Sequence, residues 1–199
     1  MLLGVVLLYV GAVLVINGIW LVGQARAAKL APAPAGGPGE AAVAHPAFIE
    51  NREIAVLNVF TGFIGVVAAV TLVVQGNQNE DLASIRAAGY ILLFAFTYLW
   101  VASNQFLNAG GHAFGWYCLF VSITAVAAGI FTFSNADGNN ASIYLGVDWF
   151  AWAVLWGLFF VLLALERPIA RLTGWVAIIQ GIGTSWVFAI LLLEGELAF

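Results

Sequence analysis

Three tryptophans in the last third of the chain have the spacing best suited to contacting a solute. Trp149, Trp152 and Trp156 follow one another at i, i+3 and i+7, which places three indole rings on one side of a helix. Phe96 and Trp100, at i and i+4, form a second aromatic pair on one face. Aromatic faces held close together form a narrow, rigid slot in which a small planar molecule can slide. The same spacing is also typical of ordinary aromatic packing, so both interpretations are open at this point.

Neutral polar side chains accompany the aromatic ones. In a membrane, amides and hydroxyls hydrogen-bond helices together for roughly 0.6–2 kcal/mol each, and they can also replace the water that a solute loses. The residues of this kind are Asn17, Asn58, Thr97, Asn104, Ser122, Thr124, Gln180, Thr184 and Ser185. An uncharged slot gives an ion nothing to offset its dehydration. It suits urea and short amides, which are planar and neutral.

The ionisable residues form neither a catalytic set nor a metal site. The two histidines, His45 and His112, and the single cysteine, Cys118, are too far apart to suggest a ligand set. There is no Ser/His/Asp arrangement and no pair of carboxylates at membrane depth. The sequence therefore predicts a protein that is not an enzyme and needs no metal or cofactor. Six Lys and Arg residues in total also argue against nucleic acid as a partner.

Composition identifies the medium in which these residues lie. The chain has 199 residues, of which 63% are hydrophobic and 8% charged, and its mean hydropathy is +1.03. An ordinary soluble domain is about 45–50% apolar and about 25% charged, and a surface so poor in charge would not stay dispersed in water. Such an apolar chain is not disordered either. We therefore expect an integral membrane protein in contact with lipid.

Six segments are long and apolar enough to cross a bilayer. A spanning helix needs about 20 mostly apolar residues, and helices satisfy their own backbone hydrogen bonds in lipid. The segments lie at about 2–23, 54–75, 87–107, 113–133, 145–165 and 169–193. The expected fold class is an all-α integral membrane protein with one domain of six transmembrane helices. Because most loops are short, helices that follow one another are expected to pack as antiparallel hairpins.

The first loop, at 24–53, is the longest and contains the run APAPAGGPG at 31–39, which favours a flexible connection. Basic residues then predict the orientation. Five of the six fall in the first, third and fifth loops. They are Arg26, Lys29, Arg52, Arg167 and Arg171. The positive-inside rule places these loops in the cytoplasm and both termini outside, in a multi-pass protein of the cytoplasmic (inner) membrane.

One acidic residue, Asp148, falls inside a predicted span, about one turn from its start. Ion and proton pathways usually have ionisable residues at membrane depth, and none lies at the middle of a predicted span. This pattern argues against pumps, proton-coupled transporters and most ion channels. The alternative, a transporter that couples amide uptake to protons, would depend on Asp148.

Several stretches, taken in order, resemble the AmiS/UreI family of urea and short-chain amide channels. They are MLLGVVLLYVG at 1–11 continuing to Asn17-Gly18, LFAFTYLWVASNQ at 93–105, GWYCLFV at 115–121 and WAVLW at 152–156. The resemblance covers nearly the whole chain except the first loop. Each stretch is weak evidence alone, and their common order is what makes the resemblance specific.

The resemblance implies passive conduction through a pore in each protomer, built from three helix hairpins, with six protomers forming a homohexameric ring. It implies constrictions at Leu7, Val10, Leu14, Phe96, Trp100, Trp149, Trp152, Leu155 and Trp156. The aromatic residues found from spacing are among them. The resemblance therefore favours pore lining over packing.

Two departures from the urea channels of this family bear on the substrate. Those channels have Glu where this chain has Gln180, and Tyr where it has Trp100. The chain resembles the amide-transporter branch more closely. We therefore expect short aliphatic amides such as acetamide to be the preferred solutes, with urea also permeant.

A further departure bears on gating. Acid-gated members of the family carry His in their external loops, whereas the second and fourth loops here contain Glu80, Asp81, Arg86 and Asp137 and no His. Only His ordinarily changes its charge between about pH 5 and 8. We therefore expect a pore without a physiological acid gate, and a proton-gated urea channel is the alternative.

Overall fold

The computed structural model describes residues 2–30 and 49–199, and over these ranges the chain consists of helices and their connections. Five spans are single helices, and the sixth is divided by a π-helical segment. The elements are α1 (Leu2–Leu30), α2 (Asn51–Gln78), α3 (Leu82–Leu107), α4 (His112–Ser134), α5 (Asn140–Leu163), α6 (Ala170–Gln180), η1 (Gly181–Trp186) and α7 (Val187–Leu193). Six stretches are long and apolar enough to cross a membrane. The predicted all-α fold with six spans is confirmed.

Several helix boundaries differ from those predicted, among them the start of α3, which lies at Leu82, five residues earlier than expected. Helix α1 continues to Leu30, so the start of the predicted first loop is helical; residues 31–48 of that loop lie outside the described ranges. Helix α5 begins at Asn140, five residues earlier than expected. Asp148 is therefore more than two helical turns from the start of α5, instead of one. Its side chain is only 2% exposed.

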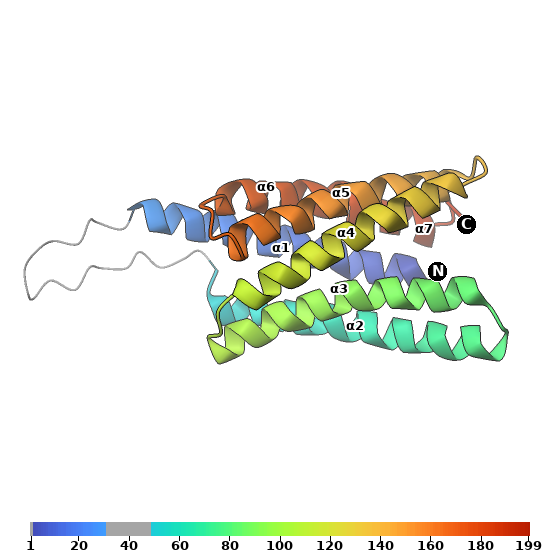
Figure 1. The fold of residues 1–199 in the computed structure, drawn as a ribbon, viewed down its shortest axis with the longest axis horizontal. Coiled ribbons are helices and arrows are strands. Elements are labelled where there is room, and N and C mark those ends of the chain that lie inside the picture. Colours follow the sequence, from blue (N-terminus) through green and yellow to red (C-terminus); the bar gives the residue numbers. More distant parts are fainter. Residues whose placement is uncertain (1, 31–48) are drawn as a thin grey trace, which may run out of the picture.

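The helices pack as three antiparallel pairs around a central space (Figure 1). Helix α2 pairs with α3, and α4 pairs with α5, as short connections predict. The third pair joins the first span to the last, because α1 packs along α6, η1 and α7. Helices α3 and α4 follow one another, but their backbones lie apart and they meet through large side chains such as Trp100 and Tyr117. The expectation that successive helices pair therefore holds for two pairs.

Glycines bring the first and last spans together. Gly4, Gly11 and Gly18 recur every seven residues, which is close to two helical turns, so they share one face of α1. A Cβ atom at Gly18 would lie 2.5 Å from the carbonyl oxygen of Gly174, and one at Gly11 would lie 3.0 Å from that of Gly181. Such small residues allow two backbones to approach closely. This contact makes the pair of first and last spans possible.

The two ends of the bundle differ in charge. Both chain termini lie at one end, here called the terminal end (Figure 1), together with the α2–α3 and α4–α5 connections. The opposite end, here called the basic end, carries five basic residues. They are Arg26, Lys29, Arg52, Arg167 and Arg171. This asymmetry is the one from which the positive-inside rule predicts a cytoplasmic basic end.

Candidate pore between the helix pairs

Two cavities occupy the space between the helix pairs. The larger cavity, here called the vestibule, has a volume of about 690 Å³ and lies towards the terminal end. The smaller cavity, here called the chamber, has a volume of about 30 Å³ and lies deeper in the bundle. Phe94 and Trp152 line both cavities. These two side chains, here called the partition, therefore separate the vestibule from the chamber.

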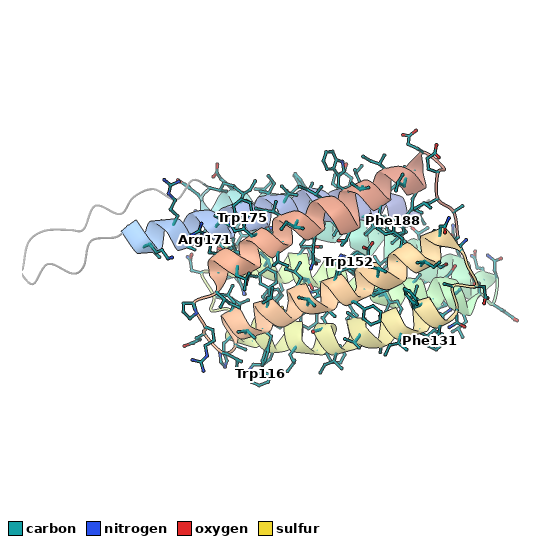
Figure 2. The ribbon with its side chains drawn as sticks, turned by 90° about the horizontal axis from the view of Figure 1, so that it is seen from above. Trp116, Phe131, Trp152, Arg171, Trp175 and Phe188 are labelled. Carbon is teal, nitrogen blue, oxygen red and sulfur yellow. The ribbon has the colours of Figure 1, made fainter. Side chains whose placement is uncertain are left out.

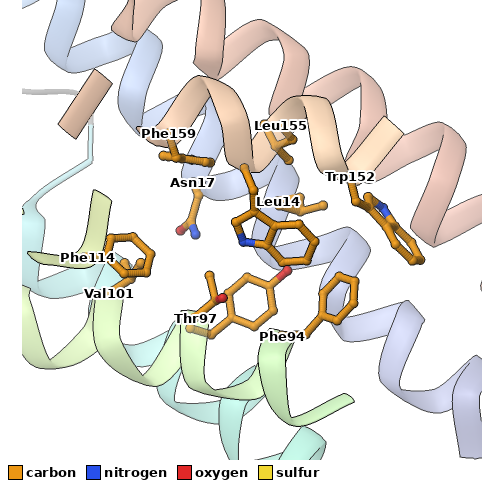
Figure 3. A pocket seen from close by; sticks show the side chains of 11 residues that line it. Leu14, Asn17, Phe94, Thr97, Val101, Phe114, Trp152, Leu155 and Phe159 are labelled. Atoms are coloured by element: carbon orange, nitrogen blue, oxygen red, sulfur yellow. The ribbon is translucent and has the colours of Figure 1, made fainter. Parts of the chain in front are cut away.

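The chamber is lined by four helices and is mostly aromatic and aliphatic (Figure 3). Its lining consists of Leu14, Asn17, Phe94, Thr97, Tyr98, Val101, Phe114, Trp152, Leu155, Trp156 and Phe159. Figure 3 shows Phe94 and Trp152 at one side of the chamber, with Asn17 and Phe114 at the other. One water molecule needs about 10–15 Å³ of such a cavity. The chamber therefore has room for a solute of only a few heavy atoms.

Phe94 is the centre of an aromatic cluster that joins α3 to α5. Its ring centroid lies 5.7 Å from Trp149, 4.8 Å from Trp152 and 4.7 Å from Trp156. Trp149 and Trp152 are 5.2 Å apart, with their planes at 84°. Edge-to-face contacts of this kind are favourable because the ring edge is positive and its face negative. The three tryptophans found from their spacing therefore lie on one face and meet a single phenylalanine.

The aliphatic residues of α1 that the resemblance implied lie along the same path. Leu7 and Val10 line the vestibule, and Leu14 lines the chamber. On α5, Trp149 borders the vestibule, whereas Leu155 and Trp156 border the chamber. Figure 2 shows Trp152 inside the bundle, while Trp116 and Trp175 lie at its periphery. The three tryptophans of α5 are thus buried inside the bundle, whereas Trp116, Trp175 and Trp186 are about half exposed.

The structure corrects the register predicted for α3. Phe96 is 49% exposed on the outer surface. Trp100 packs against Phe114 and Tyr117, with ring centroids 5.7 and 5.4 Å away, and it lines neither cavity. The positions that line the chamber are Phe94 and Tyr98, which have the same i, i+4 spacing two residues earlier. Two residues correspond to a rotation of about 200° around a helix, so the shift moves the aromatic pair to nearly the opposite side.

Gln180, the remaining predicted site residue, lies behind the tryptophans and lines neither cavity. Its amide nitrogen donates to the carbonyl oxygen of Ala151 at 2.8 Å, which ties α6 to the backbone of α5. Its Oε1 atom is buried without a partner among the described residues. In this structure Gln180 therefore supports the helix that carries the tryptophans.

Asn17 and Asn58 give the chamber a polar edge. The two amides donate to each other at 3.1 and 2.8 Å, and Asn58 also donates to the carbonyl oxygen of Ile54 at 2.8 Å. Asn17 lines the chamber, whereas Asn58 is fully buried behind it. The sequence shows both residues as polar but does not predict that they pair, because they lie 41 positions apart on different helices.

Formal charge is confined to the outer part of the path. Of the residues that line the two cavities, Arg86 alone is charged, and it lies in the vestibule at the first turns of α3. Its guanidinium carbon lies 5.2 Å from the centre of the Phe131 ring, a cation–π contact. The lining of the chamber is neutral. Such a path offers a neutral solute aromatic faces and amides, and offers an ion no compensation for its lost water.

Asp81, in the connection that precedes α3, is held in a hydrogen-bonded helix cap. Asp81 caps α3 and accepts hydrogen bonds from the Ser84 hydroxyl at 2.6 Å and the Ala83 N–H at 2.9 Å. These bonds, the Ser84 hydroxyl first, hold the pKa of the Asp81 carboxyl below its usual value of 3.8. The described residues contain no group of three His, Cys, Asp or Glu placed to hold a metal ion.

Comparison with known proteins places the chain in a family. A model described as "AmiS/UreI family transporter" matches residues 42–196, which is more than half of the chain. The chain belongs to the AmiS/UreI family. Over 194 residues this AmiS/UreI protein is 36% identical to a protein of Mycolicibacterium smegmatis named as an amidate substrates transporter, covering 97% of this chain and 77% of that one.

This AmiS/UreI protein is also similar to the urea channel of Helicobacter pylori, in sequence and in fold. It is 31% identical over 212 residues to the acid-activated urea channel of Helicobacter pylori, with 96% of each chain covered. The crystal structure of the Helicobacter pylori urea channel matches the fold with a TM-score of 0.78 and 30% identity, over 100% of both chains. The AmiS/UreI protein described here is therefore a multi-pass membrane transporter or channel for amides or urea, and not an enzyme.

Proposed function

We propose that this protein is a passive channel for short aliphatic amides such as acetamide, with urea also permeant. The observation that carries the proposal is the pair of neighbouring cavities that share Phe94 and Trp152 as lining residues. A solute that passes this partition moves from the vestibule into a neutral chamber. Both compartments lie within one protomer, so each chain has its own path.

The lining accounts for a preference for small, planar, neutral solutes. Aromatic rings on either side of the path leave room for a flat molecule. An amide buried without hydrogen bonds costs roughly 1–3 kcal/mol on mutational scales, and the chamber reduces this cost through Asn17, Thr97 and Tyr98. A charged solute would lose much more hydration than these neutral groups replace.

Two observations support amides over urea as the main solutes. The chain has a neutral Gln180 at the position where the family resemblance implies Glu in the urea channels. Its identity to the transporter named for amidate substrates, 36%, is higher than its 31% identity to the acid-activated urea channel.

Conduction without acid activation is supported by the lack of His in the two terminal-end connections and by the lowered pKa of Asp81.

Stopped-flow flux into proteoliposomes tests this function. Acetamide and urea are compared at pH 7.5 and pH 5, without a proton gradient, in wild type, Trp152→Ala and Trp156→Ala. We expect rapid flux at both pH values, altered by either tryptophan substitution. Trp116→Ala is the matched control, because Trp116 is half exposed on the outer surface. Strong activation between pH 7.5 and 5 would instead identify a proton-gated channel.

Assembly is part of the proposal. We propose a homohexameric ring of six protomers embedded in lipid, each with its own pore, in the cytoplasmic membrane with both termini outside. The resemblance to the family supports the ring, and the basic end supports the orientation. Native mass spectrometry of the detergent-solubilised protein tests the ring, and a different stoichiometry would refute it.

A second candidate function is a proton-coupled amide transporter, and Asp148 is the observation that favours it. Its side chain is 2% exposed, and Oδ2 has no partner among the described residues. Buried carboxylates at membrane depth often serve proton pathways. Asp148→Asn should abolish uptake in a coupled transporter and leave gradient-driven flux through a channel largely unchanged.

A further inference from the structure

The sixth span contains a π-helical segment beside the tryptophans of α5. Residues Gly181–Trp186 form η1, and the N–H of Val187, just after it, donates to the carbonyl oxygen of Ile182, five residues back. π-helical turns are rare, and they are found frequently at functional sites. The contacts between this segment and the residues that line the pore therefore bear on function.

Side chains of α5 and the sixth span connect the π-helical segment to the pore wall. The Trp152 indole N–H donates to the Thr184 hydroxyl at 2.8 Å. The Thr184 hydroxyl donates to the carbonyl oxygen of Gln180 at 2.7 Å. The Tyr144 hydroxyl donates to the carbonyl oxygen of Gly183. Two backbone carbonyls of this region thus accept hydrogen bonds from side-chain hydroxyls. One of these hydroxyls, that of Thr184, also accepts the hydrogen bond from Trp152.

The direction of each bond follows from the chemistry of the groups. An indole nitrogen can only donate, and a threonine hydroxyl has a single hydrogen. Because Thr184 gives its hydrogen to the Gln180 carbonyl, its oxygen is left to accept from Trp152. Rotation of the Trp152 ring would leave that buried N–H without a partner. The hydrogen bond therefore favours one orientation of the indole.

We propose that Thr184 is a positioning residue that holds the Trp152 indole in the partition and thereby determines which solutes pass. The inference rests on the proposed function, in which solutes cross between Phe94 and Trp152. Thr184 lines neither cavity, so it acts through Trp152. With its N–H bound to Thr184, Trp152 presents its carbon framework to the path. The partition then selects solutes by their thickness, so that planar amides pass and branched amides are held back.

The first test measures the orientation of Trp152 without any transport assay. In the ¹⁵N-labelled, detergent-solubilised protein, the Trp152 indole N–H signal is assigned by its loss in Trp152→Phe. Thr184→Val should move this signal upfield and speed its exchange with solvent, whereas Thr184→Ser, which keeps the hydroxyl, should leave it near the wild-type position. Thr184→Ala serves as a second variant if Thr184→Val does not fold. An unchanged signal in the variant without the hydroxyl would overturn the positioning role.

The second test measures selectivity in proteoliposomes as the ratio of acetamide flux to pivalamide flux. Both carry the same amide group, and pivalamide adds a tetrahedral carbon beside it. Loss of one neutral hydrogen bond corresponds to roughly a two- to tenfold change in rate, so Thr184→Val should lower the ratio by about that factor. Thr184→Ser should restore the ratio. A purely structural defect would reduce the amount of active protein and leave the ratio unchanged.

Ser122→Ala is the matched control. The Ser122 hydroxyl joins α4 to the Ala153 carbonyl oxygen of α5 at 2.8 Å, and Ser122 lines neither cavity. We expect this variant to keep both the wild-type Trp152 signal and the wild-type flux ratio. In Thr184→Val, a shifted Trp152 signal together with an unchanged flux ratio would refute the role of Thr184 in selection. Absence of acetamide flux in the wild type, with the signal shift intact, would refute the proposed function and leave the orientation of Trp152 by Thr184 established.

Discussion

Substitution of Phe94 is the sharpest test of the path, because a second phenylalanine two residues away provides the control. Phe94 is 8% exposed and contacts three tryptophans, whereas Phe96 is 49% exposed on the outer surface. A solute that crosses the partition must separate Phe94 from Trp152. An aromatic pair contributes about 0.5–1.5 kcal/mol beyond its buried area. Removal of this contact in Phe94→Ala should therefore speed acetamide flux by roughly two- to tenfold.

The same substitution should weaken selectivity, because it removes a ring that lines both the vestibule and the chamber. The assay is stopped-flow light scattering on proteoliposomes with equal amounts of reconstituted protein, using acetamide and pivalamide. We expect Phe96→Ala to stay within about a factor of two of wild type, since typical surface changes alter free energies by at most about 0.5 kcal/mol. Equal effects of the two substitutions, or slower acetamide flux in Phe94→Ala, would refute the assignment of the path.

Three other outcomes are expected. Gly18→Ala places a Cβ atom 2.5 Å from the Gly174 carbonyl oxygen and should lower thermal stability in detergent by about 1–3 kcal/mol, whereas Gly89→Ala, with open space around it, should not. Asn58→Ala leaves the Asn17 amide without its partner and should cost about 1–3 kcal/mol in the same assay. Asp81 has a lowered pKa in the folded protein, so its ionised form stabilises the fold above about pH 4 and loses this effect as pH falls further. The stability difference between wild type and Asp81→Asn should therefore be constant from pH 7.5 to 5 and shrink as the pH falls below about 4.

Several features of this protein follow from local sequence alone. Hydropathy over about 20 residues predicts each span without knowledge of the others, and all six are present. The tryptophans of α5 share a face because i, i+3 and i+7 spacing belongs to one rigid helix. The difference in charge between the two ends is equally local, since it depends only on which connection contains each Arg or Lys.

The contacts between helices required the tertiary structure. Gly4, Gly11 and Gly18 are regularly spaced in the sequence, but nothing local to α1 indicates that they face the last span. The pairing of Asn17 with Asn58, and the bond from Trp152 to Thr184, join residues 41 and 32 positions apart. Each partner is visible as a polar residue, and only packing shows which two meet.

The register of α3 shows the physical reason most clearly. Phe94 with Tyr98 and Phe96 with Trp100 have the same spacing and similar hydrophobicity, yet only the first pair faces the chamber. In a soluble protein, water would require a polar outer face and would reveal the inner one. Lipid is as apolar as the interior of the bundle, so hydrophobicity does not distinguish the two faces of a spanning helix. The sequence by itself therefore determined which segments span the membrane and which residues share a helix face, and packing against the other helices decided which face lines the pore.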